Sequence, residues 1–211
     1  MSDVDQTAPE SVGAVILGAG YGRRFGTDKR FAEIDGQPVA KITCSKYCAV
    51  FDHVRVVVRP DDDRLQQQLA ALDLETVVAE QAHLGMGHSL AAGFTNLTWA
   101  WAFVALMDMP YIATHTLQTL KAKALSAPEG KIVVPALDAE FLATTNEASL
   151  KLDQKTCHPM AWHAAYFAQI AQSKGDEGAR RLLRANRSHI IRVAVADSGI
   201  IQDIDHPDDL R

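Results

Sequence analysis

A short apolar run that leads into a basic, glycine-rich loop is the feature that most constrains the fold of this chain. The residues A-V-I-L at positions 14–17 are followed by G-A-G-Y-G-R-R-F-G-T-D-K at positions 18–29. Glycines let a backbone turn sharply and approach a ligand closely, and their N–H groups can form an anion-binding concavity. Residues 22–30 add four cations against one acidic residue, Asp28. The segment predicts a β-strand followed by a loop that binds a polyphosphate.

The spacing of the glycines excludes the two most common phosphate-loop fingerprints. A dinucleotide-binding G-x-G-x-x-G that starts at Gly18 would need a third glycine where Arg23 stands. A P-loop needs glycine, lysine and Ser/Thr in succession, whereas Gly26 is followed by T-D-K. The plain alternative is a strand–turn–helix connection with a solvated basic patch, but four glycines in nine positions are costly unless something lies against them.

Apolar, β-rich runs alternate with helical stretches along the rest of the chain. This pattern is typical of an α/β fold with a parallel or mostly parallel sheet covered on both faces. No linker or repeat divides residues 1–211, so we expect a single domain in which residues 1–12 form a flexible tail. The expected strands are Ala14–Leu17, Val54–Val58, Thr76–Val78, Phe103–Leu106, Lys131–Pro135 and Ile190–Val195. The expected helices are Val39–Val50, Asp62–Leu72, Met86–Asn96, Thr114–Leu125, Ala164–Ala171 and Gly178–Ala185.

The bulk composition permits one large core and argues against several kinds of partner. With 211 residues, of which 47% are hydrophobic, one domain with a full core is expected. The net charge of −5 argues against a nucleic-acid or membrane surface. Three cysteines do not complete a disulfide set, and none has C-x-x-C zinc spacing. The N-terminus is polar and acidic, and no run approaches the ~18 apolar residues of a membrane span, so we expect a cytoplasmic protein.

A carboxylate stands at the end of a second apolar run, F-V-A-L-M-D-M-P at positions 103–110. Asp108 follows the apolar residues directly, and Pro110 stops the strand. A carboxylate at the end of a buried strand is costly unless a cation meets it. The alternative is an aspartate that hydrogen-bonds its own turn.

The two motifs together resemble those of the nucleotidyltransferase superfamily. The loop L-G-A-G-Y-G-R-R-F-G-T-D-K is similar to the signature L-A-A-G-x-G-x-R-x-G-x-x-K, and F-A-E-I-D-G-Q-P-V is similar to the K-x-L-x-x-I-x-G-x-P-L that follows it. Within this superfamily the chain resembles the molybdenum-cofactor nucleotidyltransferases, and most of all their cytidylyl-transferring branch. The resemblance implies a Rossmann-like three-layer sandwich of the nucleotide-diphospho-sugar transferase type. Its mostly parallel mixed sheet would carry the site at the carboxyl ends of the strands.

The resemblance also implies roles for the residues of the first loop. The loop would hold the β- and γ-phosphates of a nucleoside triphosphate, and Arg24 and Lys29, expected on a solvent-facing loop, would act as catalytic cations. The residues of this segment that we expect to bind nucleotide are Leu17, Gly18, Ala19, Gly20, Gly22, Arg23, Arg24 and Lys29.

For the metal, the resemblance points to aspartates. In the family the aspartate matching Asp108 holds Mg²⁺, so we expect Asp108 to be both a metal ligand and a catalytic residue, although Met107 stands where glycine is usual. A second carboxylate would suit Mg²⁺, and I-Q-D-I-D-H-P-D-D-L offers Asp203 and Asp205, which face one side if extended. The segment is similar to the family's D-I-D-T-P-E-D-L ending. By position Asp203 matches the metal aspartate of related sugar nucleotidyltransferases, so it is favoured over Asp205, and a helix start at Pro207 is the alternative.

Base recognition is expected in E-Q-A-H-L-G-M-G-H-S-L-A-A-G, positions 80–93. It is similar to the family's G-M-x-x-S-L element, which contacts a pyrimidine, and this implies nucleotide-binding roles for Glu80, Gly85 and Ser89. A plain helix N-cap is the alternative for Ser89. The guanylyl branch tends to carry G-P-L-x-G here and a glycine where this chain has Ala19, so the sequence favours CTP over GTP.

The acceptor side is expected at T-C-H-P-M-A-W, positions 156–162, which is similar to the family's G-H-P-V-x-F motif. This implies acceptor binding by His158 and Pro159, and a turn histidine satisfied by the backbone is the alternative. Cys157 replaces the usual glycine, and residues 138–156 are longer and more polar than the family's loop. Downstream, G-D-E-G-A-R-R-L-L resembles the family's G-D-x-G-A-R, where Asp176 is expected to cap a helix.

The resemblance therefore implies a Mg²⁺-dependent enzyme that transfers CMP from CTP to the phosphate of molybdopterin or molybdenum cofactor, with release of pyrophosphate. A phosphate acceptor is already ionised, so no general base is needed, and no motif provides one. A molybdoenzyme is the expected transient partner, whereas nucleic acid and membrane are not. The alternatives are use of GTP, transfer to another phosphorylated metabolite, and, from another class, a non-catalytic nucleotide-binding regulator.

Overall fold

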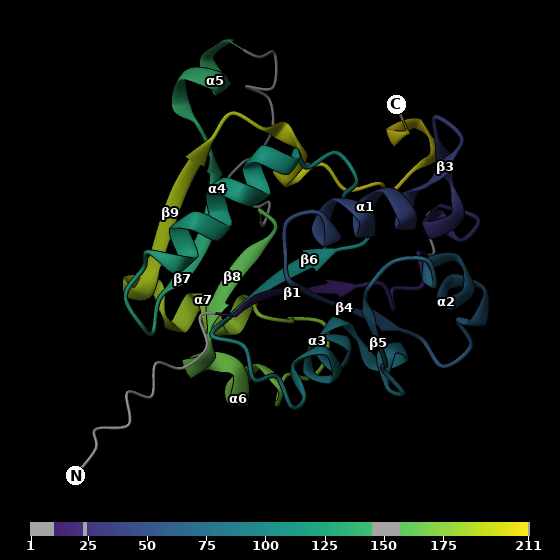
Figure 1. Ribbon diagram of the computed structural model, residues 1–211, viewed down its shortest axis with the longest axis horizontal. Helices are drawn as coiled ribbons and strands as arrows, with labels where there is room; N and C mark the ends of the chain where they lie inside the picture. The colour runs from purple at the N-terminus through teal and green to yellow at the C-terminus, as the bar shows by residue number, and fades with distance from the viewer. Residues whose placement is uncertain (1–10, 23–24, 145–156, 211) are drawn as a thin grey trace.

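A computed structural model of the chain describes residues 11–22, 25–144 and 157–210. It is built on a seven-stranded sheet with the strand order β5-β4-β1-β6-β8-β7-β9 (Figure 1). The strands are β1 (Val12–Leu17), β4 (His53–Val58), β5 (Glu75–Val78), β6 (Trp101–Leu106), β7 (Ile132–Leu137), β8 (Met160–His163) and β9 (Ile190–Val195). The first strand begins at Val12, and the Ser11 carbonyl accepts a hydrogen bond from Ala100 N–H. Residues 11 and 12, which were expected to belong to a flexible tail, are therefore held at the sheet.

The sheet is mixed, and β8 makes it so. This strand pairs antiparallel with β6 and β7, whereas the other four pairings are parallel. The predicted mostly parallel mixed sheet is therefore confirmed, with every expected strand present to within two residues. The sequence pattern missed β8 itself, because its four residues M-A-W-H are too short for a periodicity and follow a proline.

Helices cover both faces of the sheet, as the three-layer prediction requires (Figure 1). One face packs against α1, α2 and α4 through a core that includes Cys44, Leu65 and Leu117. The other face packs against α3 and α6 through Phe94 and Phe167, whose rings meet edge to face at 5.2 Å. The helices are α1 (Val39–Cys48), α2 (Asp63–Leu69), α3 (Met86–Phe94), α4 (Thr114–Leu125), α5 (Ala139–Thr144), α6 (Phe167–Ile170) and α7 (Arg180–Ala185).

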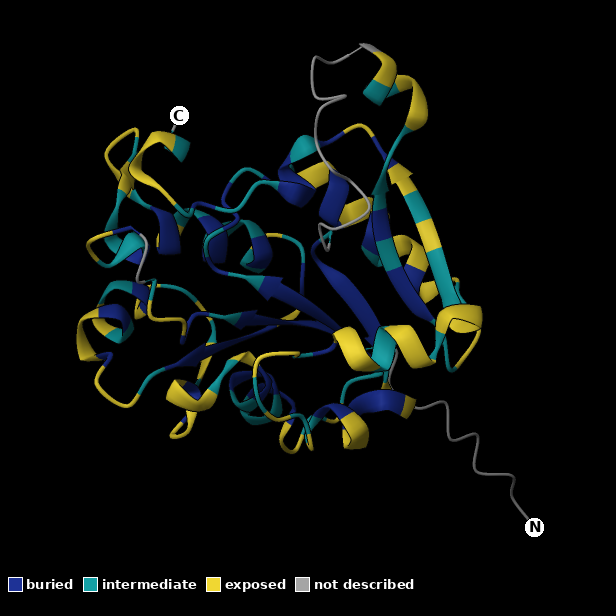
Figure 2. Ribbon diagram, turned by 180° about the vertical axis from the view of Figure 1, so that it is seen from behind, coloured by how far each residue is buried: buried dark blue, intermediate teal, exposed yellow. Residues whose placement is uncertain are grey.

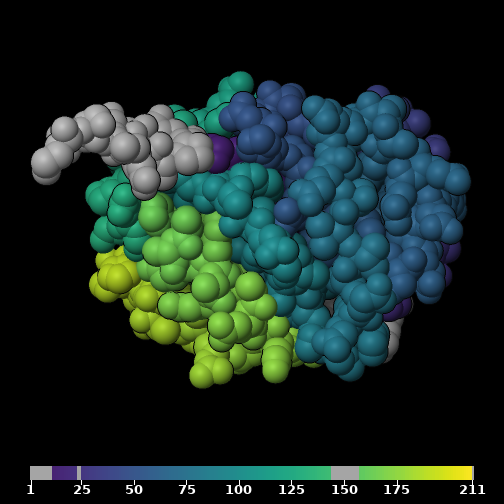
Figure 3. Space-filling view, turned by 60° about the horizontal axis from the view of Figure 1, so that its bottom comes forward, coloured from purple at the N-terminus to yellow at the C-terminus, as the bar shows by residue number. Residues whose placement is uncertain are grey.

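Strand alternation explains why two cores form. In β1, Ala14 and Ile16 face the α1 side while Val15 faces the α3 side, and all three are fully buried. The central strands are buried along their length, whereas in β9, at the edge of the sheet, exposed residues alternate with less exposed ones (Figure 2). Figure 3 shows the green residues after β8 lying against the blue segment that contains α3.

Three short elements near the first loop were not predicted. Lys29–Phe31 form the 3₁₀ helix η1, and β2 (Glu33–Ile34) pairs with β3 (Gln37–Pro38) in a small hairpin. Asp35 and Gly36 form its turn with φ of 50° and 72°. The D-G pair is a known signal for such a two-residue turn.

The strand order places a crevice at the carboxyl ends of β1 and β6. The chain runs from β1 outward through β4 to β5 and then returns to β6 on the other side of β1. Open α/β sheets bind ligands where the strand order reverses in this way. The glycine loop follows β1 and Asp108 follows β6, so the topology brings the two predicted motifs together.

Candidate functional site

The glycine loop starts from a tightly packed position. Gly18 N–H donates to the Val57 carbonyl at 2.9 Å, and a Cβ at this position would lie 2.5 Å from Met107 Cε. A side chain at position 18 would therefore require the end of Met107, the residue that departs from the family pattern, to move. Gly22 has φ of 51°, a left-handed value that favours glycine. The predicted nucleotide-binding residues Arg23 and Arg24 lie outside the described residues.

A buried ion-pair network supports the loop from behind. Arg30 is only 3% exposed and donates both to the Gly18 carbonyl at 2.8 Å and to the two Asp62 carboxylate oxygens at 2.6 Å. Asp28 accepts from Arg30 and from Arg59, which also contacts Asp62. The count of four cations in residues 22–30 suggested that Arg30 could bind a phosphate. Because Arg30 is held in this network, it is not available to one. Sequence reasoning missed this network because it joins two segments, residues 28–30 and 59–62, whose cross-pairs Arg30–Asp62 and Arg59–Asp28 are 32 and 31 positions apart.

Lys29 lies between two carboxylates at the mouth of the crevice. Its Nζ is 2.5 Å from Asp108 Oδ2 and 3.1 Å from Asp205 Oδ1, and it also donates to the Ile204 carbonyl at 2.6 Å. Burial acts to lower the pKa of Lys29, but Asp108 and Asp205 outweigh it and the pKa is raised. The side chain is only 14% exposed, so the expectation of a solvent-facing lysine was wrong.

The C-terminal segment brings both predicted aspartates to this place. Ile204 N–H donates to the Asp108 carbonyl at 2.9 Å, and the Ile204 side chain is fully buried against Phe25. Asp203 and Asp205 flank Ile204, so in an extended chain their side chains point to the side opposite the Ile204 side chain. Burial raises the pKa of Asp108 against the effect of Lys29, and the charge of Asp203 raises it further.

The alternative of a helix start at Pro207 also holds. The 3₁₀ helix η7 (Pro207–Asp209) follows directly, and Asp209 Oδ2 accepts from the N–H groups of Asp205 and His206 at 2.9 and 2.7 Å. This turn fixes the backbone that carries Asp205. The two expectations for this segment are therefore compatible.

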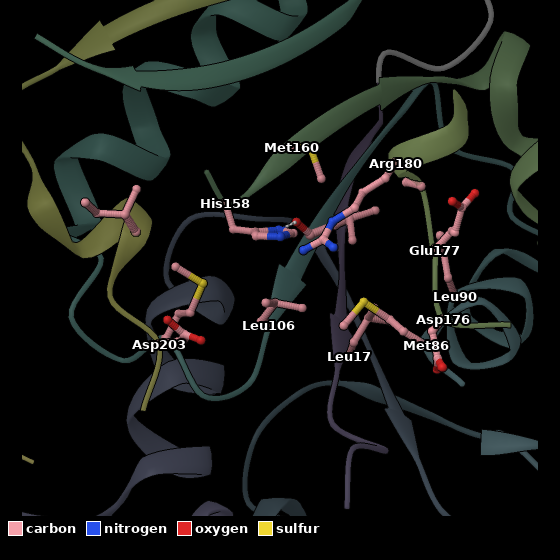
Figure 4. A pocket seen from close by; sticks show the side chains of 14 residues that line it. Leu17, Met86, Leu90, Leu106, His158, Met160, Asp176, Glu177, Arg180 and Asp203 are labelled. Atoms are coloured by element: carbon pink, nitrogen blue, oxygen red, sulfur yellow. Dashed lines mark hydrogen bonds between the residues drawn. The ribbon is translucent and has the colours of Figure 1, made fainter. Parts of the chain in front are cut away.

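Two connected hollows form the cleft above these residues. They share Leu17, Met86, Leu106 and Asp176. The larger, here called the glycine lobe, has a volume of about 570 Å³ and is lined by Leu17, Ala19, Gly20, Tyr21, Gly22, Lys29, Ala82, His83, Gly85, Met86, Ser89, Leu106, Asp108, Asp176 and Asp205. The smaller, here called the histidine lobe, has a volume of about 270 Å³ and is lined by Leu17, Met86, Leu90, Val104, Leu106, Met109, His158, Met160, Asp176, Glu177, Ala179, Arg180, Ile201 and Asp203 (Figure 4).

The element expected to read the base lies along the glycine lobe. Ser89 is buried within α3, whose N-cap is Gly85, so the N-cap alternative for Ser89 was wrong. Gly87 N–H donates to the Gly175 carbonyl at 2.7 Å, so the close approach at this glycine is to the chain's own backbone. Glu80 is exposed and lies outside both linings, so it is not brought to the cleft with the others.

His158 closes the far end of the histidine lobe. Its backbone N–H donates to the Ile200 carbonyl at 2.9 Å, and the peptide bond to the buried Pro159 is cis. Nδ1 lies 3.4 Å from the Val104 carbonyl, which can only accept, so Nδ1 carries the proton and Nε2 is an acceptor. Burial lowers the pKa of His158 to about 4, so the ring is neutral at pH 7.

Other residues near the histidine lobe differ from expectation. Cys157 packs against the apolar cluster of Val195, Ile200 and Ile201 and does not line the lobe. The N-cap of α7 is Ala179, so Asp176 does not cap that helix and instead borders both lobes. The G-D-E-G-A-R motif was the available signal for Arg180, whose role the sequence left unassigned.

The described residues contain neither a ready-made metal cluster nor a membrane-spanning helix. No group of three or more His, Cys, Asp or Glu side chains within them stands ready to hold a metal ion. Within the same ranges, no helix has the length and apolarity needed to cross a bilayer.

A mixed α/β sheet with a glycine loop and an aspartate at adjacent strand ends defines a nucleotidyltransferase-type fold, and comparisons with known proteins agree. The MobA-like NTP transferase domain model matches residues 14–190, and the chain belongs to this family of nucleotidyltransferases.

Named relatives and a solved structure illustrate the range of this similarity. The purine catabolism protein PucB of Bacillus subtilis (strain 168) is 28% identical over 207 residues, which cover 92% of each chain. A probable molybdenum cofactor guanylyltransferase of Natranaerobius thermophilus is 23% identical over 151 residues, 71% of this chain and 69% of that one. Rv0371c of Mycobacterium tuberculosis H37Rv, solved in complex with manganese, has a TM-score of 0.72 at 21% identity and covers 94% of this chain and 95% of its own.

Proposed function

We propose that this protein transfers CMP from CTP to the phosphate of molybdopterin or molybdenum cofactor and releases pyrophosphate. The observation that carries the proposal is the position of Lys29 between Asp108 and Asp205, directly beside a glycine loop at the switch point of the sheet. Catalysis of phosphoryl chemistry is mainly positioning and charge stabilisation. A cation flanked by carboxylates in a lobe that Gly20 and Gly22 also line supports that chemistry.

The proposed reaction balances without a general base. An oxygen of the acceptor phosphate attacks the α-phosphorus, the bond from that phosphorus to the bridging β-phosphate oxygen breaks, and pyrophosphate leaves with the electron pair. Lys29 and Arg24 would neutralise charge that develops on the leaving group. The one histidine in the lining of the histidine lobe has a pKa that burial lowers to about 4, so it is a weak base at pH 7, which agrees with a reaction that takes no proton from its acceptor.

The carboxylates of the cleft fit a divalent cation that arrives with the nucleotide. Mg²⁺ is commonly held by one or two carboxylates plus substrate phosphates, so the lack of a ready-made three-ligand cluster among the described residues is no obstacle. Asp108 with Asp203 is the proposed pair, because Asp203 matches by position the metal aspartate of related sugar nucleotidyltransferases and its charge acts on Asp108. Asp205 is the runner-up. When bound, the ion would neutralise the phosphate oxygens. The manganese complex of Rv0371c supports a divalent metal in this fold.

The choice of CTP rests on the wall of the glycine lobe. Ala19 is 1% exposed and lines that lobe together with the buried Ser89. In this proposal a glycine at position 19 would leave more room for a purine, and the Ser89 hydroxyl would hydrogen-bond an edge of the cytosine. GTP is the second candidate, because a relative that aligns over 71% of this chain is named as a guanylyltransferase.

The experiment is a panel of CTP, GTP, UTP and ATP, each assayed for pyrophosphate release with Mg²⁺, with and without molybdopterin. We expect release with CTP that depends on molybdopterin. Release with CTP and a different phosphorylated acceptor would move the activity to that acceptor. Nucleotide binding without release under every condition would favour the non-catalytic regulator.

A further inference from the structure

The histidine lobe contains a cation that the proposed nucleotide chemistry does not use. Arg180 begins α7, and Figure 4 shows its guanidinium directed across the lobe toward His158. Its charge acts on that ring, because it is one of the influences that lower the pKa of His158. Among the residues lining this lobe, no lysine and no other arginine is present.

Arg180 is an exposed residue that forms no direct ion pair with the described carboxylates of the lobe. Within the described ranges its guanidinium has no ion pair or side-chain hydrogen bond, whereas Arg30, Arg55 and Arg59 all do. The nearest acidic neighbour in sequence, Glu177, accepts from Arg184 at 3.0 Å. An arginine directed into a lobe while its carboxylate neighbour is paired elsewhere is suited to an anion from outside the chain.

The other residues that line the lobe indicate what kind of molecule would carry that anionic group. Three thioether side chains, Met86, Met109 and Met160, line it together with aliphatic residues. Methionines adapt to irregular apolar shapes and contact aromatic rings favourably. His158 adds an uncharged acceptor, Nε2, which suits an N–H donor on such a ring. Asp203, Asp176 and Glu177 are the acidic residues of the lining, and Asp203 stands beside Asp108 on the side of the proposed metal.

We infer that Arg180 binds the anionic group of the acceptor in the histidine lobe and thereby sets the affinity for the acceptor rather than for the nucleotide. The inference rests on the proposed function, because it assumes a phosphorylated acceptor. The substrate class is a phosphate monoester on a flat, N–H-bearing ring system. The acceptor phosphate would lie between Arg180 and the end of the histidine lobe that carries Asp203, next to the glycine lobe with Asp108.

The test compares Arg180→Ala and Arg180→Lys with Arg181→Ala. Arg181 is the adjacent residue of α7, is exposed and lines neither lobe, so it controls for loss of a surface charge. The protein is saturated with Mg²⁺ and an α,β-methylene analogue of CTP, which cannot transfer CMP, and is titrated with molybdopterin by its absorbance. The dissociation constant of the CTP analogue is measured separately for each variant by calorimetry.

We expect Arg180→Ala to weaken molybdopterin binding by ~10-fold or more, since bidentate charge-assisted contacts are lost, with the affinity for the CTP analogue unchanged. Arg180→Lys should recover part of the loss, and Arg181→Ala should match the unmodified protein. Equal binding by Arg180→Ala and the unmodified protein would overturn the inference. So would a loss of nucleotide affinity in Arg180→Ala, or the absence of molybdopterin binding to the unmodified protein. Pyrophosphate release plays no part in this titration, so a protein that binds molybdopterin through Arg180 but does not turn over would refute the proposed function alone.

Discussion

Replacing Lys29 with methionine should destabilise the protein without metal and make it more responsive to Mg²⁺. The substitution removes the ammonium but keeps an unbranched side chain, which limits the loss of packing around position 29. Without the ammonium, Asp108 and Asp205 lose the cation that separates them. Their repulsion then has to be relieved by protonation, by water or by a bound ion.

The size of the effect follows from the exposure of the three side chains. Lys29, Asp108 and Asp205 are 14%, 21% and 35% exposed. Exposed pairs contribute ~0.2–1 kcal/mol, and breaking a fully buried pair costs ~3–5 kcal/mol. A partly screened pair lies between these limits, so we expect a loss of about 2 kcal/mol in the free energy of unfolding. For a chain of this length that is a fall in Tm of roughly 4–8 °C.

The assay is thermal unfolding in EDTA and in Mg²⁺, with Lys41→Met as the control because Lys41 is an exposed lysine of α1. Mg²⁺ should raise the Tm of Lys29→Met by more than it raises that of the unmodified protein, since ligand that binds only the folded state stabilises it. Turnover should be lost even where Mg²⁺ restores the Tm. An unchanged Tm in EDTA, or an equal Mg²⁺ response in both proteins, would refute the view that Lys29 compensates these carboxylates.

Three other changes test separate parts of the molecule. Asp108→Asn keeps the shape but removes the charge, so Mg²⁺-dependent pyrophosphate release should fall by ~100-fold or more. Urea unfolding should show a smaller loss of stability than Lys29→Met, because Lys29 loses Asp108 but keeps Asp205 and the Ile204 carbonyl. An unchanged Mg²⁺ requirement would place the ion elsewhere. Asp62→Ala leaves Asp28 as the only carboxylate partner of the buried Arg30 and should lower the free energy of unfolding in urea by about 3 kcal/mol. Asp61→Ala, at an exposed neighbour, should cost little. Equal effects of the two substitutions would contradict the network. Folding lowers the pKa of His158 from 6.5 to about 4, so the unfolded chain binds a proton at a higher pH than the folded protein does. The free energy of unfolding should therefore fall as the pH drops from about 6.5 toward 4, by up to roughly 3 kcal/mol. His158→Asn should lack that part of the pH dependence, and an identical pH profile would show that His158 is not its source.

The parts of the fold that could be predicted are those in which local sequence and burial agree. β1 and β6 are long apolar runs bounded by glycine or proline, and both were located from the pattern alone. Asp108 followed from the same logic, since a carboxylate at the end of a buried strand needs a cation, and the structure provides Lys29. The strand order then brings these motifs together without further assumptions.

The parts that could not be predicted depend on contacts between distant residues. Arg30 and Lys29 are adjacent cations in the sequence, yet one pairs with Asp62 behind the loop and the other with Asp108 in the cleft. No local pattern separates them, because the difference arises from partners on other elements. In the same way β8 is recognisable only once β6 and β7 stand on either side of it.

The ratio of kcat/KM for CTP to that for GTP, measured by pyrophosphate release with molybdopterin as the acceptor, tests the central claim most directly. The buried methyl group of Ala19 and the hydroxyl of Ser89 in the glycine lobe lead us to expect a preference for CTP of ~10-fold or more, which corresponds to ~1.4 kcal/mol. Ala19→Gly should relax this preference toward GTP. Equal values for the two nucleotides in the unmodified protein would contradict the cytidylyl assignment, and no release with either would contradict nucleotidyl transfer itself.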